Sequence, residues 1–235
     1  MAEERGRSFW NRDFLLALAG YFFLFMSVSL FFLLPVILEK FSPRQSRIGL
    51  IMGIFSVVAI AVRPFFGRMI DVRGGRRIAL LGLFLLIVSV PFFHFVDDAG
   101  WLPFLLRALT GLGWGVSMTA TIAMCSDLAP ADRLAKSMGV IGVAGLVANA
   151  LGPLLAEELI RDGGAGRLYN VSLLFLVASV GCVLAAREFP KTECDGALAG
   201  GMKALKLVPW ALAAVVASVP VADPAPTRYQ NSASP

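Results

Sequence analysis

The sequence predicts an all-helical integral membrane protein with six transmembrane helices. Hydrophobic residues make up 57% of the 235 residues and charged residues 16%, with a mean hydropathy of +0.76, which is too apolar for a water-soluble domain. A helix needs about twenty apolar residues to cross a bilayer. Six segments reach that length, with charges and turn residues between them. The expected spans are 14–36, 48–67, 78–96, 101–124, 137–157 and 168–186.

Lysine and arginine are unevenly distributed over the connecting segments. One side would carry eleven of them: Arg5, Arg7, Arg12, Arg68, Arg73, Arg76, Arg77, Arg133, Lys136, Arg187 and Lys191. The other side would carry five: Lys40, Arg44, Arg47, Arg161 and Arg167. Because cytoplasmic loops are enriched in cations, we expect the amino terminus and the end of the sixth span in the cytoplasm. Residues 1–13 mix acids and bases, so we expect no cleaved signal peptide and a retained first span.

The first span carries two serines, Ser27 and Ser29, among many phenylalanines. The two hydroxyls could face a cavity or another helix. Contact with another helix is favoured, because small polar residues commonly join membrane helices.

A basic hairpin from Gly67 to Arg77 connects the second and third spans. The adjacent glycines Gly74 and Gly75 allow the positive φ values that a tight reversal requires. One carboxylate, Asp71, is surrounded by four arginines: Arg68, Arg73, Arg76 and Arg77. A charged turn that only sets the orientation of the helices would also explain this composition.

The order Gly-x-x-x-Asp-x-x-Gly-x-Arg-Arg in this hairpin resembles the loop between helices two and three of the major facilitator superfamily of secondary transporters. The preceding residues 63–66, Arg-Pro-Phe-Phe, are similar to those of bacterial drug and sugar efflux members. Val72 departs from the pattern, since the family usually has a cation there, which weakens or re-routes the family's gating salt bridge. The resemblance implies an inner gate made by Gly67, Asp71, Arg73, Gly74, Arg76 and Arg77.

The fourth span contains Arg107 within an Arg-x-x-x-Gly-x-Gly run, which is also similar to the facilitator family. Arg107 lies about 9 Å inside a span that begins at Trp101. An arginine at that depth either snorkels outward or faces a wet cavity. The resemblance favours a cavity, in which Arg107 senses or couples protonation. Four further residues share its face at helical spacing, either in the substrate path or as helix contacts: Thr110, Trp114, Ser117 and Thr121.

The fifth span carries a stripe of small residues that permits close helix approach: Gly139, Gly142, Gly145, Ala148 and Gly152. Its end resembles the Gly-x-x-x-Gly-Pro signature of drug/proton antiporters, with Ala148 in place of the first glycine and with Gly152 and Pro153 matching. The resemblance implies a helix that seals against the other half of the transporter. An ordinary packing helix is the alternative. Asn149 is a polar group inside the membrane and needs a partner or a substrate.

The loop 161–167 echoes the Asp, Gly-Gly and Arg of the basic hairpin. This echo, with the facilitator resemblance, implies two inverted three-helix repeats that form one half of a facilitator fold. The half would cover residues 1–190. Residues 191–235 differ in composition, with an apolar run at 205–222 that is interrupted by prolines. They could be an interfacial segment, a weak seventh span, or sequence left by truncation or a frame change, and an incomplete protein is favoured.

Several other functions are disfavoured by the residue types present. Cys125, Cys182 and Cys194 show no metal-ligand spacing, and His94 is the single histidine, so we expect no metal, haem or other cofactor and no redox enzyme subunit. The net charge of +5 fits basic inner loops near anionic lipid better than nucleic-acid binding.

The sequence therefore predicts a non-enzymatic transporter in a bilayer, the bacterial plasma membrane by resemblance. The implied activity is proton-coupled efflux of a small organic molecule by alternating access, with uptake or symport left open. No carboxylate falls in the middle of a span, since Asp13, Glu157 and Glu158 lie near span ends. The alternative is a half-size or truncated chain that does not transport alone. A homodimer or a second six-helix half would then complete it.

Overall fold

The computed structural model describes residues 11–39, 45–96, 100–129 and 133–186. These residues form helices and no strand, which confirms the predicted all-helical membrane fold. The chain begins with α1 (Arg12–Ser29), which continues through the 3₁₀ turn η2 (Leu30–Leu33) into α2 (Leu34–Glu39). The helices that follow are α3 (Gln45–Arg73), α4 (Gly75–Ser89), η3 (Pro91–Phe95), α5 (Trp101–Leu128) and α6 (Leu134–Ala185).

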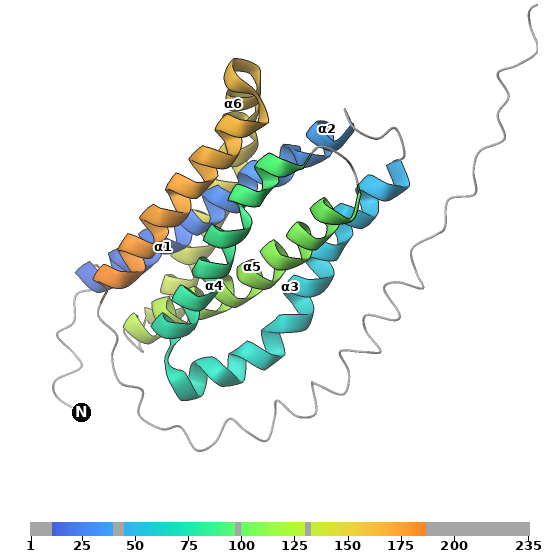
Figure 1. Cartoon of the computed structure of the whole chain (residues 1–235). Coiled ribbons are helices and arrows are strands. Elements are labelled where there is room, and N and C mark those ends of the chain that lie inside the picture. The colour runs from blue at the N-terminus through green and yellow to red at the C-terminus, as the bar shows by residue number, and fades with distance from the viewer. Residues whose placement is uncertain (1–10, 40–44, 97–99, 130–132, 187–235) are drawn as a thin grey trace, which may run out of the picture. The chain divides into compact units, whose positions relative to one another are not determined.

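The described chain has five helices that are long and apolar enough to cross a membrane, where the sequence predicted six. The difference lies in α6, whose 52 residues contain both the fifth and the sixth expected spans. A straight helix of that length would reach about 78 Å, more than twice the thickness of a bilayer core. Gly164 interrupts it with φ 74° and ψ −174°, and Figure 1 shows the helix reversing between its yellow and orange limbs.

The expected boundaries of the loop between the second and third spans were wrong. The second span was expected to end at 67, but α3 continues to Arg73. The expected loop over 67–77 is therefore helical except at Gly74, where φ is 88°. Helical hydrogen bonds satisfy the backbone of polar residues as well as apolar ones, so a charged composition did not end the helix.

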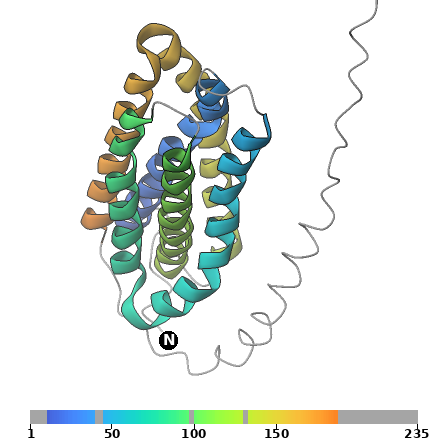
Figure 2. The same ribbon diagram turned by 45° about the vertical axis from the view of Figure 1, so that its right-hand side comes forward.

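α5 occupies the centre of the packing, with α3 and α4 on two sides of it, as Figure 2 shows. α1 packs mainly along α6. The contacts of α3 and α4 with α5 are close. A Cβ added at Gly111 of α5 would lie 2.5 Å from the Phe55 carbonyl oxygen of α3. A Cβ at Gly82 of α4 would lie 2.8 Å from the Gly113 carbonyl oxygen. Glycines thus bring three helix backbones together, as is usual in membrane bundles.

The ends of the helices alternate between the two ends of the bundle. Figure 1 places the start of α1, the α3–α4 connection, the end of α5 and both ends of α6 at one end of the bundle. The ends of α2 and η3, the starts of α3 and α5 and the reversal within α6 lie at the other. The expected domain boundary at 190 and the apolar run at 205–222 lie outside the described residues.

Candidate functional site

In the basic hairpin the chain reverses direction at a single non-helical residue, Gly74. The Gly74 amide donates a hydrogen bond to the Ile70 carbonyl at 3.0 Å, which closes the last turn of α3, and Gly74 then takes a φ of 88° and a ψ of 146°. This region is open almost only to glycine. Gly75 is already the first residue of α4. The expectation that both glycines supply positive φ was therefore wrong for Gly75.

Gly75 is needed for a close approach instead. A Cβ at this position would lie 2.8 Å from Cγ of Met124 and 3.2 Å from the carbonyl oxygen of Ala120, both in α5. Gly75 is buried, and its missing side chain lets the start of α4 rest on the end of α5. The hairpin is thus seated on the helix that carries Arg107.

The hairpin charges differ in what they contact. Arg76 donates a hydrogen bond of 2.5 Å to the carbonyl oxygen of Leu184, in the last turn of α6, where carbonyls are otherwise unpaired and the helix dipole favours a cation. Within the described residues, Arg73 donates to the sulfur of Met69 of its own helix, at 3.5 Å. Asp71 and Arg77 are exposed at the same end of the bundle, and a Cβ at Gly67 would meet no atom within 4 Å.

Arg107 lies inside the bundle with 4% of its surface exposed. Its Nη2 donates to the Met52 sulfur at 3.1 Å, and its guanidinium carbon lies 4.9 Å from the centre of the Phe55 ring and 5.9 Å from that of Phe31. In the described part of the chain its Nε has no hydrogen-bond partner. The guanidinium is enclosed by aromatic and thioether groups, whereas snorkelling would leave it exposed.

The three hydroxyl residues predicted beside Arg107 bond to carbonyls of their own helix. Thr110 donates to Arg107 at 3.1 Å, Ser117 to Gly113 at 2.7 Å and Thr121 to Ser117 at 2.7 Å. Ser117 also lies in the contact between α5 and α4, since a Cβ at Gly82 would approach its amide nitrogen to 2.7 Å. These hydroxyls therefore bond within α5, so their hydrogen bonds identify neither a substrate path nor a contact between helices.

Trp114 faces α1 rather than α4. Its ring meets Phe25 edge to face, with centroids 4.5 Å apart and planes at 72°. The predicted face of α5 is thus divided among several neighbouring elements, because residues at spacings of three and four cover a wide arc of the helix. Arg107 lies against α3 and η2, Trp114 faces α1 and Ser117 faces α4.

The polar residues between α1 and α6 bond to each other. Ser29 donates to Oδ1 of Asn149 at 2.7 Å, and the hydroxyls of Ser27 and Ser172 lie 2.7 Å apart. The prediction that the two serines of the first span make helix contacts is confirmed. Asn149 is half-buried and has this partner inside the protein.

The small-residue stripe of α6 is partly covered by α1. A Cβ at Gly152 would lie 3.0 Å from the Ser29 carbonyl carbon, and one at Gly145 would lie 3.2 Å from the Tyr21 hydroxyl. By contrast, a Cβ at Gly139 or Gly142 would meet no atom within 4 Å. Of this stripe, Gly139 and Gly142 are therefore left without a close neighbour among the described residues. Pro153 lies within α6, which continues past it.

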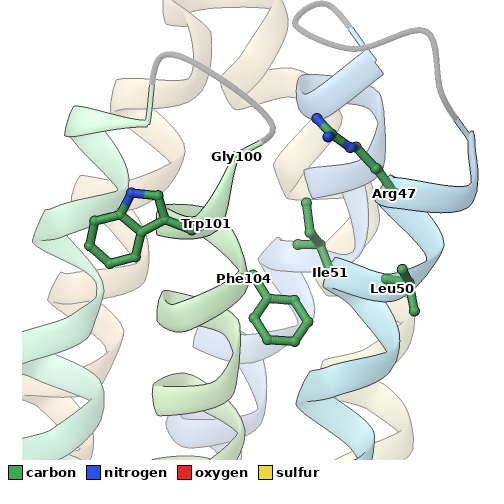
Figure 3. Close-up of a pocket in the computed structure, with 6 residues that line it drawn as sticks. All are labelled: Arg47, Leu50, Ile51, Gly100, Trp101 and Phe104. Carbon is green, nitrogen blue, oxygen red and sulfur yellow. The ribbon is translucent and has the colours of Figure 1, made fainter.

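The seam between α3 and α5 contains residues that sequence reasoning did not assign to the site. At the end of the seam where α3 and α5 begin lies a pocket of about 350 Å³ (Figure 3), lined by Arg47, Leu50, Ile51, Gly100, Trp101 and Phe104. Further along the seam, Arg63 donates to the Met118 sulfur at 3.3 Å. Arg63 was expected near a span end, but α3 continues ten residues beyond it. The described residues contain no group of His, Cys, Asp and Glu that could hold a metal ion.

A sequence model described as Major Facilitator Superfamily matches residues 16–222. The chain belongs to the major facilitator superfamily. It is 29% identical over 150 residues to the efflux pump azaK of Aspergillus niger, covering 61% of this chain and 32% of the pump. It is 30% identical over 136 residues to the MFS-type transporter YuxJ of Bacillus subtilis, covering 58% of this chain and 34% of that protein.

A third facilitator relative is the multidrug resistance protein B homolog of Mycobacterium tuberculosis. The identity is 32% over 139 residues, which covers 55% of this chain and 25% of the relative. This facilitator chain thus spans about a third of the length of the curated relatives that it matches. The described helices correspond to one six-span bundle, provided that α6 is counted as the two helices that Gly164 separates.

Proposed function

We propose that this chain supplies one six-helix half of a proton-coupled exporter of small organic molecules, which works by alternating access. The observation that carries the proposal is the burial of Arg107 in the centre of a membrane bundle. Enclosing a charged side chain there costs free energy, and such residues in membrane helices are usually functional. Relatives named as an efflux pump and a multidrug resistance protein favour export over uptake. In this proposal a second six-helix half completes the path.

In this proposal the substrate path follows α5 and its neighbours. Arg107 supplies the fixed positive charge that proton and substrate both sense, Trp114 supplies an aromatic wall, and Asn149 supplies a polar group that can exchange Ser29 for a substrate. The substrate is not expected to bond the hydroxyls beside Arg107, because they already donate to carbonyls of α5: Thr110, Ser117 and Thr121.

The gate lies at the α3–α4 reversal. Arg76 joins the start of α4 to the end of α6, so releasing this contact would let the inner end of the bundle open. Asp71 is the acidic residue of the hairpin and controls the position of its arginines. Asp71→Asn should reduce flux of an accumulated dye from cells or proteoliposomes at least tenfold while membrane insertion stays intact. Unchanged flux would refute the gating role.

The role of Arg107 is tested by charge and shape. Arg107→Ala should abolish the dependence of flux on an imposed proton gradient, whereas Arg107→Lys, which keeps the charge, should retain part of it. Equal and negligible effects of the two substitutions would contradict the assignment. The orientation follows from labelling a cysteine placed at Arg76, which we expect to react only from the cytoplasmic side.

A second candidate is an assembly partner that does not transport alone. The exposed glycines Gly139 and Gly142 favour it, because they leave a part of α6 open to close approach by another helix. Cysteine crosslinking in the native membrane from Gly142 should capture a second copy or another chain. A chain that is found only as a monomer and shows no flux in liposomes would remove both candidates.

A further inference from the structure

The seam between α3 and α5 is a continuous stripe of facing residues. On α3 the stripe is formed by Met52, Phe55, Ala59 and Arg63, which follow each other at spacings of three and four. Each of them contacts a residue of α5, and the partners also follow in chain order: Met52 contacts Arg107, Phe55 contacts Gly111, Ala59 contacts Gly115 and Arg63 contacts Met118. The two helices therefore run in the same direction, and the guanidinium of Arg63 lies against α5 at Met118.

Three arginines lie along this seam at successive depths. Arg47 lines the pocket where α3 and α5 begin, and Figure 3 shows its side chain at the edge of that pocket, above Ile51. Arg107 lies one level further in, at Met52. Arg63 follows eleven residues after Met52 on α3, which is about 16 Å by helical rise. It is exposed.

No carboxylate accompanies these cations along the described seam. The acidic residues of α3 and α5 are Asp71 and Asp127, both in the last turns at the opposite end from the pocket, and α4 has none. In the described chain the hydrogen-bond acceptors of Arg63 and Arg107 are methionine sulfurs, which accept only weakly. Cations within a membrane protein normally pair with an opposite charge. Among the described residues, Arg63 and Arg107 therefore have no carboxylate as a hydrogen-bond or ion-pair partner.

We propose that the seam binds organic anions, and that Arg63 is the residue that holds the anionic group of the transported substrate. The ligand class is a carboxylate, sulfonate or phosphate on an aromatic or aliphatic body, because the guanidinium fork of Arg63 fits such oxygens in pairs and the stripe beside it, at Ala59 and Met118, is apolar. The pocket with Trp101 and Phe104 lies at the other end of the same seam. Arg107 and Arg47 continue the route outward. This inference rests on the proposed export function and names its substrate class.

The direction of transport agrees with this substrate class. A membrane potential that is negative inside drives an anion outward, so the electrical term assists export without an acidic residue in the seam. Anion binding also removes the need for a carboxylate partner at Arg63 during the cycle, since the substrate provides it.

The test measures binding of two dyes of the same xanthene shape and opposite charge to the full chain in lipid nanodiscs. Fluorescein, an anion, should bind at least tenfold more tightly than rhodamine 6G, a cation. Arg63→Gln should weaken fluorescein binding at least tenfold, and Arg63→Lys by less than about fivefold. Arg68→Gln, an exposed cation of the same helix outside the proposed gate, should leave binding unchanged. Circular dichroism of each variant checks that the helices are retained.

Wild-type protein provides a readout that needs no variant. Raising salt should weaken fluorescein binding and leave rhodamine 6G binding unaffected, because ions screen and compete for an exposed cation. Tighter binding of rhodamine 6G, no fluorescein binding, or equal effects at Arg63 and Arg68 would overturn the assignment. Fluorescein binding without flux would leave the seam in place and remove the export function. Flux of rhodamine 6G without flux of fluorescein would support the export function and remove the assignment of the seam to anions.

Discussion

The two tight reversals of the bundle, at Gly74 and at Gly164, use the same backbone device at opposite ends. Both glycines have positive φ, 88° and 74°, and they are the positive-φ residues of the described chain. Each follows an aspartate, Asp71 or Asp162, and each connects the second and third helices of its three-helix set. The turn itself therefore does not distinguish the two ends.

The two reversals differ in what they are attached to. The residues after Gly74 dock on other helices, Gly75 on α5 and Arg76 on the end of α6. The Gly164 reversal is held mainly by its own neighbours, since Arg167 donates to the Asp162 carbonyl at 3.2 Å and the atoms nearest a Cβ at Gly163 are those of the Arg167 side chain. Its approach to another element is looser, because a Cβ at Gly166 would lie 3.8 Å from the His94 ring of η3. Docking, rather than the turn, is what marks the basic hairpin as a candidate gate.

The largest expected effect tests what the two reversals share. Gly74→Ala and Gly164→Ala should each lower the free energy of unfolding in detergent micelles by about 2 kcal/mol, because both backbones lie in a region that alanine rarely adopts. Gly139→Ala, on an exposed helical face with no neighbour within 4 Å, is the control and should lose nothing. A large difference between the two reversals would show that one of them is not a strained glycine turn.

The next effect separates the reversals. Gly75→Val should lower the free energy of unfolding by about 1.5 kcal/mol, because its side chain would press on Met124 and on the α5 backbone. Gly163→Val should cost less than about 0.5 kcal/mol, since the flexible Arg167 side chain can move aside. Equal losses measured by denaturant unfolding would contradict the docking of the hairpin on α5.

The smallest effect concerns the capping arginine. Arg76→Gln should lower the free energy of unfolding by about 1 kcal/mol, because the last carbonyls of α6 lose a charged donor. Arg167→Gln should change it by less than about 0.3 kcal/mol, since that contact is exposed and local. Hydrogen exchange at the end of α6 provides a second measurement, and it should rise only in the Arg76 variant.

The sequence by itself determined the membrane class, the apolar segments, the reversal at Gly74 and the family. These features are local, because hydropathy, glycine placement and loop charge act within one segment. It also placed Arg107 inside a span. The resemblance singled out Arg107 and the hairpin without showing what either one touches.

Tertiary packing decided which side of each helix meets which neighbour. Only the folded bundle enclosed Arg107 between Met52 and two phenylalanines, turned Ser117 to α4 and placed α1 over Gly145 and Gly152. The packing of α3 on α5 likewise placed Arg63 beside Met118, in a helix that continues to Arg73. Periodicity gives the angle between residues on one helix, but the identity of the facing helix depends on long-range contacts that no local pattern encodes.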